Sequence, residues 1–323
     1  SSGFNLVGTN IVFSSAPTGG HSFFGIIYAT ADYLNAGGTF PAGSTGSPSI
    51  TFTTDTDTGI YRRGSGDIGF VSNSTEIVNI DGNGLTVTSK DATINSVTVG
   101  KGANSVAGNT VLGETALDAS VSGGNNTAIG KDSLTACTSG SSNVAVGSGA
   151  LSANTTASSN TAVGQNALQS NSTGTLNTAI GKSALGTNNT ASNNTAVGTN
   201  ALLVNTTGTR NTAVGSLSLD ANTTANDNQA FGYLALSANT TGGSNSAFGS
   251  SALGTNTTGA SNCAFGTGSL ASNSTGNNNT AIGASTLNQN STGTRNTAVG
   301  TNALDACTTG NDNVGIGQNA LGA

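Results

Sequence analysis

Residues 194–210 read NTAVGTNALLVNTTGTR, and residues 211–227 read NTAVGSLSLDANTTAND. The unit repeats with a period of 17 from residue 109 to residue 323 as N-T-A-V-G-x-x-A-L-x-x-N-T-T-G-x-x, 13 times and without an insertion. Each unit must therefore occupy an equivalent place in a regular stack. The repeat keeps an Asn, a Gly four residues later and a Leu four residues after that Gly. These positions begin with Asn109, Asn126, Asn143 and Asn160, with Gly113, Gly130, Gly147, Gly164, Gly181 and Gly198, and with Leu117, Leu134, Leu151, Leu168, Leu185 and Leu202.

The length and composition of the unit predict a parallel β-solenoid. The unit is too short for a pair of helices, and its Thr, Asn, Val and Gly favour strands and turns. One unit therefore corresponds to one coil. At about 4.8 Å per coil, the repeats form a rod about 60 Å long.

The strand N-T-A-V-G predicts two different faces. Side chains alternate along a strand, so Thr and Val share one face while Ala and Gly share the other. We expect the bulky face to lie inside the coil, where the column that contains Ile129 and Val146 forms one ladder and the repeat Leu forms another. Three consecutive members of the bulky column, Phe231, Phe248 and Phe265, should stack as an aromatic ladder.

The small face is then expected outside. It is lined by Ala128, Ala145, Ala162 and their successors, and it suits the packing of several chains around a common axis. Each coil offers few bulky residues against the entropy of ordering a whole repeat unit, so a partner surface is needed. The repeated Gly marks either a site of positive φ or a close approach of a neighbouring chain, and the sequence leaves both open.

Composition excludes several functions. Only 7% of the residues are charged and the net charge is -6, so no basic surface favours nucleic acid. The longest apolar run, Phe23 to Ala29, is far shorter than the roughly 20 residues of a membrane span, and we expect no membrane insertion. The three cysteines, Cys137, Cys263 and Cys307, are too widely spaced for a disulfide framework or a metal cluster.

The residues before the repeats predict small antiparallel β modules. Residues 1–34 contain two strand-like runs around the turn signal Ala16 to Gly20, and residues 35–48 read as a linker. Residues 49–90 alternate short apolar runs with polar turns, including the hairpin signal Asp81-Gly82-Asn83-Gly84. Residues 91–108 are expected to form an atypical first coil that caps the solenoid.

The units from Asn109 onward resemble the S-V-A-I-G-x-x-A repeats in the heads of trimeric autotransporter adhesins. That resemblance implies a left-handed parallel β-roll in a homotrimer. Those heads generally use shorter units, so the layout of their strands need not carry over.

Two shorter segments resemble phage proteins. Phe4 to Gly20 is similar to the end of the N-terminal attachment domain in podovirus-type tail fibres, and Thr54 to Arg62 resembles modules of marine phage fibre proteins. These resemblances imply that residues 1–34 end an attachment domain and that the chain is a tail fibre shaft on the virion. Its expected partners are two further copies, other virion or fibre proteins and a host cell-surface receptor. The alternatives are a bacterial trimeric adhesin head at the cell surface and a glycan-cleaving tailspike.

An N-x-S/T sequon recurs at one position of the repeat. It predicts either a column of glycans or a ladder of stacked Asn amides, and the turn-forming chemistry of Asn favours the ladder. The column comprises Asn154, Asn171, Asn188, Asn205, Asn222, Asn239, Asn256, Asn273 and Asn290.

Two other polar patterns have competing interpretations. The pairs Thr155-Thr156 and Thr206-Thr207 would form an ice-binding hydroxyl array on a flat face, or they belong to ordinary turns. Asp55 and Asp57 are spaced like the start of a calcium loop, but no later Glu completes it, so a polar turn is favoured.

Catalytic machinery is scarce in the sequence. His21 is the single His, so a nucleophile–His arrangement has one possible base. A glycan-cleaving site needs paired carboxylates, and the closest match is Asp220 with Asp227 and, at the same phase, Asp305 with Asp312. Most other coils lack these acids, which favours solvated residues. We therefore expect no catalytic, cofactor-binding or metal site, and no enzyme activity.

Overall fold

The computed structural model describes residues 4–7, 10–13, 42–52, 54–88 and 91–322. The chain divides into two compact units, Ser1–Ser89 and Lys90–Ala323. Regular structure in the described residues is strand apart from one short 3-10 turn, so the expected all-β class is confirmed. The expected turn at Ala16 to Gly20, His21 and most of the linker lie outside the described residues.

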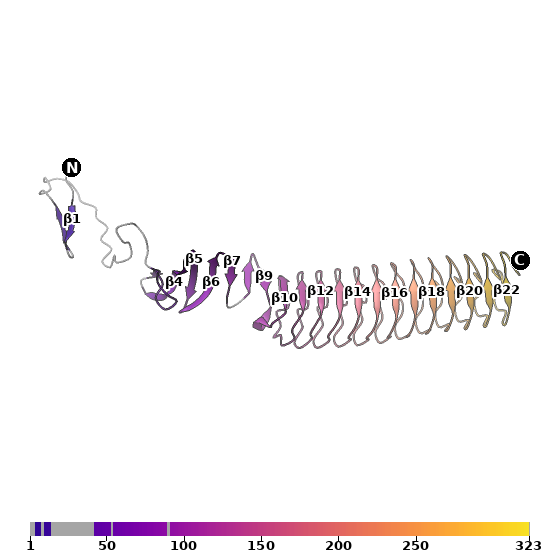
Figure 1. Cartoon of the computed structure of the whole chain (residues 1–323). Helices are drawn as coiled ribbons and strands as arrows, with labels where there is room; N and C mark the ends of the chain where they lie inside the picture. The colour runs from indigo at the N-terminus through magenta and orange to yellow at the C-terminus, as the bar shows by residue number, and fades with distance from the viewer. Residues whose placement is uncertain (1–3, 8–9, 14–41, 53, 89–90, 323) are drawn as a thin grey trace, which may run out of the picture. The chain divides into compact units, whose positions relative to one another are not determined.

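The first unit contains a hairpin and a five-stranded antiparallel sheet (Figure 1). The hairpin pairs β1 (Phe4–Val7) with β2 (Asn10–Phe13). The sheet has the order β3-β4-β5-β6-β7, so each strand pairs with its neighbour in the sequence. Its strands are β3 (Ile50–Phe52), β4 (Asp55–Gly64), β5 (Asp67–Ser72), β6 (Thr75–Asp81) and β7 (Gly84–Val87).

Local sequence signals in this sheet had mixed outcomes. The hairpin at Asp81 to Gly84 is confirmed, because Asp81 pairs with Gly84 and Gly82-Asn83 forms the two-residue loop. The polar turn expected at Asp55 and Asp57 is wrong, because both residues lie in strand β4. Asp57 accepts a hydrogen bond from Ser74 Oγ at 3.0 Å, and this bond links β4 to the turn before β6.

The second unit begins with a hairpin that covers the first edge of the solenoid. Strands β8 (Ala92–Ile94) and β9 (Val97–Gly100) are antiparallel, and β9 pairs antiparallel with β10 (Thr110–Gly113). The 3-10 turn η1 (Ala103–Ser105) connects β9 to β10. The segment 91–108, for which the sequence predicts a first coil, thus contains an antiparallel hairpin.

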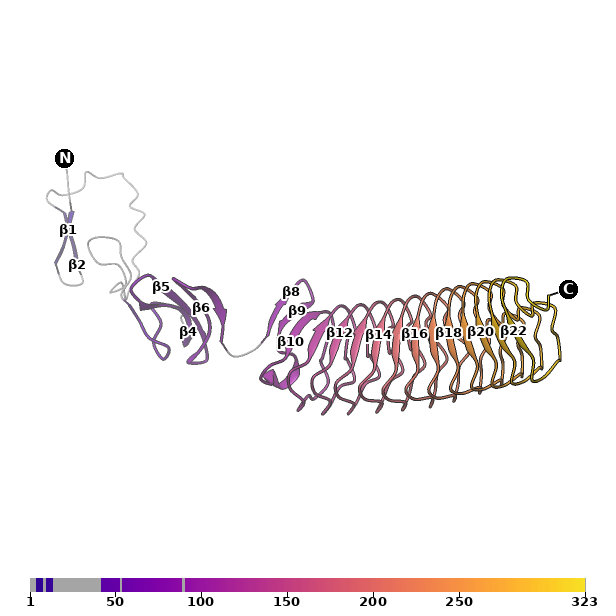
Figure 2. The ribbon, with the colours of Figure 1, turned by 45° about the vertical axis from the view of Figure 1, so that its right-hand side comes forward.

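The repeats form the solenoid. From β10 onward each coil contributes one short strand, and successive strands pair in parallel so that equivalent residues of adjacent units lie opposite each other, as in Thr195↔Thr212 (Figures 1 and 2). The parallel β-solenoid with one repeat unit per coil is therefore confirmed, whereas its left-handed sense stays a prediction. The strands after β10 are β11 (Thr127–Ile129), β12 (Val144–Val146), β13 (Thr161–Val163), β14 (Thr178–Ile180), β15 (Thr195–Val197), β16 (Thr212–Val214), β17 (Gln229–Phe231), β18 (Ser246–Phe248), β19 (Cys263–Phe265), β20 (Thr280–Ile282), β21 (Thr297–Val299) and β22 (Val314–Ile316).

The expected inside and outside faces of these strands are reversed. The middle Ala of each strand, including Ala128, Ala145 and Ala162, is fully buried. The bulky third residue is half-buried or exposed, as in Ile180 and Phe265. From Ala128 to Ala298 the buried middle residue is always Ala, packed in one core with the repeat Leu, whereas the first coil strand β10 has the buried Val111 at this position. The smooth Ala surface expected on the outside is part of the core.

Candidate functional site: the columns of the solenoid

Leu and Ala form the apolar part of each coil interior. The repeat Leu from Leu117 to Leu287 are completely buried, as expected. Each of these Leu lies in the left-handed region, with φ of 52° at Leu202 and 50° at Leu219. A non-glycine residue rarely adopts this conformation, and here it turns the large side chain into the coil. The position before Leu holds buried Ala in many coils and buried Ser or Thr in others, such as Ser218 and Thr286.

The Asn at the start of each strand forms a first buried ladder. The side chain of Asn194 accepts a hydrogen bond from the backbone N–H of Asn211 at 3.0 Å. Nδ2 of Asn211 in turn donates to the Ala225 carbonyl at 2.8 Å. Equivalent bonds run from Asn109–Asn126 to Asn296–Asn313. The repeat Asn therefore satisfies backbone groups that strand pairing leaves free inside the coil.

The sequon Asn form a second buried ladder, which is the interpretation the sequence favoured. Asn205 Nδ2 donates to Asn188 Oδ1 at 3.0 Å and to the Gly208 carbonyl at 2.9 Å, and Asn222 Nδ2 donates to Asn205 Oδ1 at 2.9 Å. All nine Asn from Asn154 to Asn290 are completely buried. Their amide nitrogens face the coil interior and are engaged, so in the folded solenoid they are closed to a glycan.

The repeat Gly meets both conditions that the sequence left open. Its φ is positive in every coil from Gly130 to Gly317, for example 135° at Gly198. A Cβ on Gly198 would lie 2.6 Å from the carbonyl oxygen of Gly215 in the next coil. The close approach is thus between successive coils of one chain. Both the backbone angle and this contact exclude a side chain.

The outward face of the sheet carries two columns. The first strand residue is mostly Thr, and the third is Val, Ile, Leu or Phe in every coil. In the third column, Ile180, Phe265 and Ile282 are 41%, 40% and 44% exposed. None of the strands β10 to β22 contains a charged residue. An uncharged apolar column of this length is the most distinctive surface of the solenoid.

The three Phe of that column stack as the sequence predicts, although on the outer surface. The ring centroids of Phe231 and Phe248 are 4.6 Å apart with an interplanar angle of 7°. Those of Phe248 and Phe265 are 4.4 Å apart at 6°. The parallel register of the strands is thus kept where the residues of the column are largest.

The Thr pairs contribute to coil stacking. Thr155 Oγ1 donates to the Ser172 carbonyl at 3.3 Å, and Thr206 Oγ1 donates to the Thr223 carbonyl at 3.0 Å. The first hydroxyl of these pairs is therefore directed at the next coil. This bonding supports the turn interpretation over an ice-binding array.

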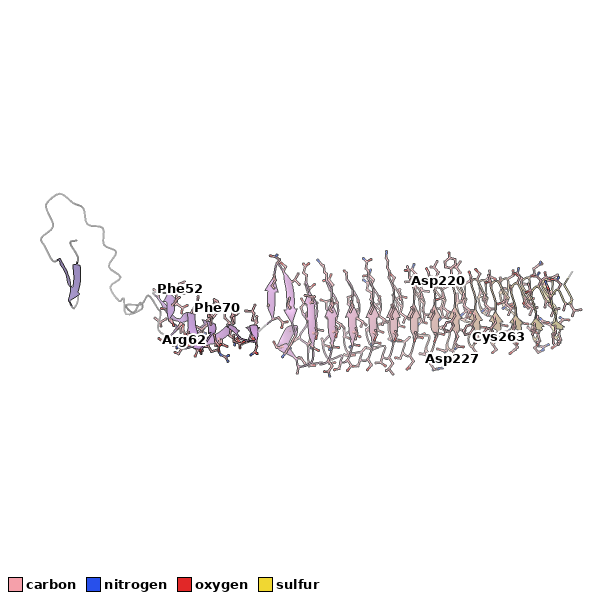
Figure 3. All side chains as sticks on the ribbon, turned by 45° about the horizontal axis from the view of Figure 1, so that its top comes forward. Phe52, Arg62, Phe70, Asp220, Asp227 and Cys263 are labelled. Atoms are coloured by element: carbon pink, nitrogen blue, oxygen red, sulfur yellow. The ribbon has the colours of Figure 1, made fainter. Side chains whose placement is uncertain are left out.

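The acids of the repeats are not brought together in carboxylate dyads. Asp220 and Asp227 lie at opposite edges of the solenoid (Figure 3). The Asp227 carboxylate is held by Arg210, with Nε–Oδ1 at 2.6 Å and Nη2–Oδ2 at 2.9 Å. Hydrogen bonds from Arg210 lower the pKa of Asp227. By contrast, burial raises the pKa of Asp220, whose Oδ1 has no hydrogen-bond partner.

The same ion pair recurs five coils later. Arg295 Nε lies 2.6 Å from Asp312 Oδ1, and Nη2 lies 2.8 Å from Oδ2. The hydrogen bonds from Arg295 lower the pKa of Asp312. Glu114 is paired with Lys131 at 3.1 Å. These acids form cross-coil ion pairs, and in the described residues no group of three or more His, Cys, Asp or Glu is arranged to hold a metal ion.

The three cysteines have two different environments. Cys137 and Cys307 take the place of the sequon Asn at the ends of that ladder, and Cys137 is completely buried. Burial raises the pKa of the Cys137 thiol. Cys263 (labelled in Figure 3) is the first residue of β19, in the outward column that is otherwise mostly Thr, and Phe265 of the Phe stack is the third residue of the same strand. All three are free thiols.

The sequence contained a signal for the outward face that its interpretation missed. The middle strand position is Ala in every coil from Ala128 to Ala298, whereas the third position varies from Val to Phe. A packed interior does not tolerate such a change of volume, but a surface column does. The described part of the chain contains no helix with the length and apolarity needed to cross a membrane. Comparison with protein-family models, with curated proteins and with solved structures finds no match to this chain.

Proposed function

We propose that the chain is a non-catalytic structural subunit of a phage tail fibre shaft that takes part in host attachment. The observation that carries this proposal is the unbroken register of the solenoid. The strands from β10 to β22 pair in parallel without a bulge, and the buried Asn ladders continue through the coils. A stack of identical hydrogen-bonded coils resists bending, which is what a shaft requires.

We propose further that three copies assemble through the outward face of the sheet. At about 4.8 Å per strand and about 10 Å of strand length, the face covers roughly 600 Å². A stable interface buries about 800 Å² on each partner, so this face is of the right order. Its lack of charge and its continuous column of Val, Ile and Phe are typical of an interface core. The sequence assigned this role to the Ala face, which the buried Ala residues make untenable.

The assembly gives the attachment role a physical basis. The segments between strands vary from coil to coil, as in Gln165-Asn166 and Tyr233-Leu234, while the framework stays constant. Three copies would present each variable surface three times, and repeated weak contacts add up through avidity. The proposed partners are therefore other virion proteins and a host cell-surface receptor, and the proposed location is the virion.

The proposal is tested with antibodies raised against the purified full chain. Immunogold microscopy should label fibres on virions, and native mass spectrometry should give a particle of three chains. Label on bacterial envelopes with none on virions would instead identify a surface adhesin. Cleavage of host polysaccharide by the purified protein would overturn the structural role.

A further inference from the structure

One face of the sheet of the first unit carries a continuous apolar patch, which Thr58 and Ser72 border on the same face. Cross-strand pairing sets two adjacent rows of side chains on this face, because residues two apart on a strand point the same way. The first row crosses all five strands through Ile50, Ile60, Phe70, Val78 and Val87. The second crosses four strands through Arg62, Ile68, Ile80 and Leu85. The two rows together are called the bare face below.

No side chain of the bare face is buried in the single chain. Ile68 is 46% exposed and Leu85 is 68% exposed. Within residues 42–52 and 54–88, the buried apolar side chains are Pro48, Tyr61 and Val71 alone. A folded domain needs two layers packed around a core, and a single sheet with so few buried apolar residues has no such core.

The opposite face of the sheet is already covered by its own side chains. The ring of Tyr61 lies so close over Gly69 that a Cβ there would be 2.3 Å from Tyr61 Cε1. The Tyr61 hydroxyl is hydrogen-bonded to Glu76, and Arg63 Nε lies 3.2 Å from the same carboxylate. The missing layer therefore belongs on the bare face.

The chemistry of the bare face restricts what covers it. Eight of its nine side chains are apolar and uncharged polar groups are absent, while its one charged residue, Arg62, lies at the end of the second row. A complementary surface must be apolar and without acids in its centre, with room for Arg62 to reach water at the rim. The bare face of another copy of this chain meets that description.

We infer that the bare faces of different copies of this chain pack together and form the hydrophobic core that the first unit lacks. The inference rests on the proposed assembly of the fibre, because each sheet is joined through residues 89 and 90 to a solenoid. Solenoids that associate hold their sheets at high effective concentration. A weak contact between sheets then becomes a stable one.

The test uses the full chain with a single cysteine introduced on either side of strand β7. Leu85→Cys places a thiol on the bare face, and Thr86→Cys places one on the opposite face of the same strand, where the side chain is also exposed in the single chain. Maleimide labelling of each site is followed by peptide mass mapping, which separates it from the native cysteines. In the purified protein, Leu85→Cys should react roughly tenfold or more slowly than Thr86→Cys, because reaction requires the sheets to separate. In denaturant the two rates should become equal.

A second position and a mass measurement distinguish the possible failures. Ile68→Cys, at the centre of the second row, should be protected like Leu85→Cys. If the purified protein is a multimer and both bare-face thiols react as fast as Thr86→Cys, the inference is overturned while the assembled shaft stands. If the native mass is that of one chain, the inference and the proposed trimer both fail.

Discussion

The buried amide ladder makes a quantitative prediction at Asn205. Replacement by Ala removes three side-chain hydrogen bonds: two donated by Nδ2, to Asn188 and to the Gly208 carbonyl, and one accepted from Asn222. Each buried bond contributes a net stability of about 1 kcal/mol, so Asn205→Ala should lower the free energy of unfolding by about 3 kcal/mol. The site is completely buried, so bulk solvent does not reach the freed partners while the coil stays closed.

The ladder supplies its own internal comparison. Asn290 makes two such bonds, to Asn273 and to the Gly293 carbonyl, while its Oδ1 has no partner. Asn290→Ala should therefore cost about 2 kcal/mol, one bond less than Asn205→Ala. Thr206→Ala is the matched control, since Thr206 is exposed and donates one hydrogen bond.

The assay is denaturant unfolding followed by circular dichroism at fixed protein concentration, with hydrogen exchange to locate the loss. Exchange should accelerate most in the coils next to the substituted residue, because coils interact with their neighbours alone. If Asn205→Ala costs no more than Thr206→Ala, the amide ladder does not stabilise the solenoid and the reasoning is refuted.

Three further predictions follow from the same columns. Cys307→Asn should raise stability by about 1 kcal/mol in denaturant unfolding, because it gives the unpartnered Oδ1 of Asn290 a donor; a loss of stability would contradict the ladder. Phe248→Glu should dissociate the native assembly in sedimentation while Thr241→Glu, at an exposed site outside the sheet, leaves it intact; equal behaviour of the two would reject the outward face as the interface. Burial raises the pKa of Asp220, so its carboxylate weakens the fold as the pH rises from the ordinary carboxyl pKa through the raised one. Asp220→Asn should therefore increase the thermal midpoint at pH 7 but not at pH 3, and a variant less stable at pH 7 would disprove this.

The period of the sequence was sufficient to predict the solenoid. Because the repeat has a constant length and no insertion, each unit is predicted to form one coil. In the structure Thr195 accordingly pairs with Thr212, the equivalent residue of the next unit. The amide ladder was also predictable, because Asn at one phase of a stack must face Asn of the next coil. The solenoid and the amide ladder both depend on the spacing of the repeat, and this spacing can be read directly from the sequence.

The prediction of the inside and outside faces was wrong because alternation along a strand separates two sets of side chains but does not say which set faces the interior of the coil. Val146 and Ala145 are equally compatible with the interior until the width of the coil is known. Much of that interior is filled by Leu151, whose positive φ of 51° turns its buried side chain inward into the same core as Ala145. A rare backbone angle at a Leu is not visible in composition or spacing. The bare face could not be predicted from the sequence for a related reason. Phe70 and Ile80 lie on the same face of the sheet only because of the register in which β5 pairs with β6.

The hydrogen bonds between coils also decide how the rod responds to force. A pull on the two ends of the chain loads the last coil first, since each coil is bonded to its neighbours alone. One coil that peels away releases one repeat unit, or about 60 Å of extended chain, in exchange for about 5 Å of rod. We therefore expect the solenoid to be stiff under small loads and to lengthen in uniform steps under large ones.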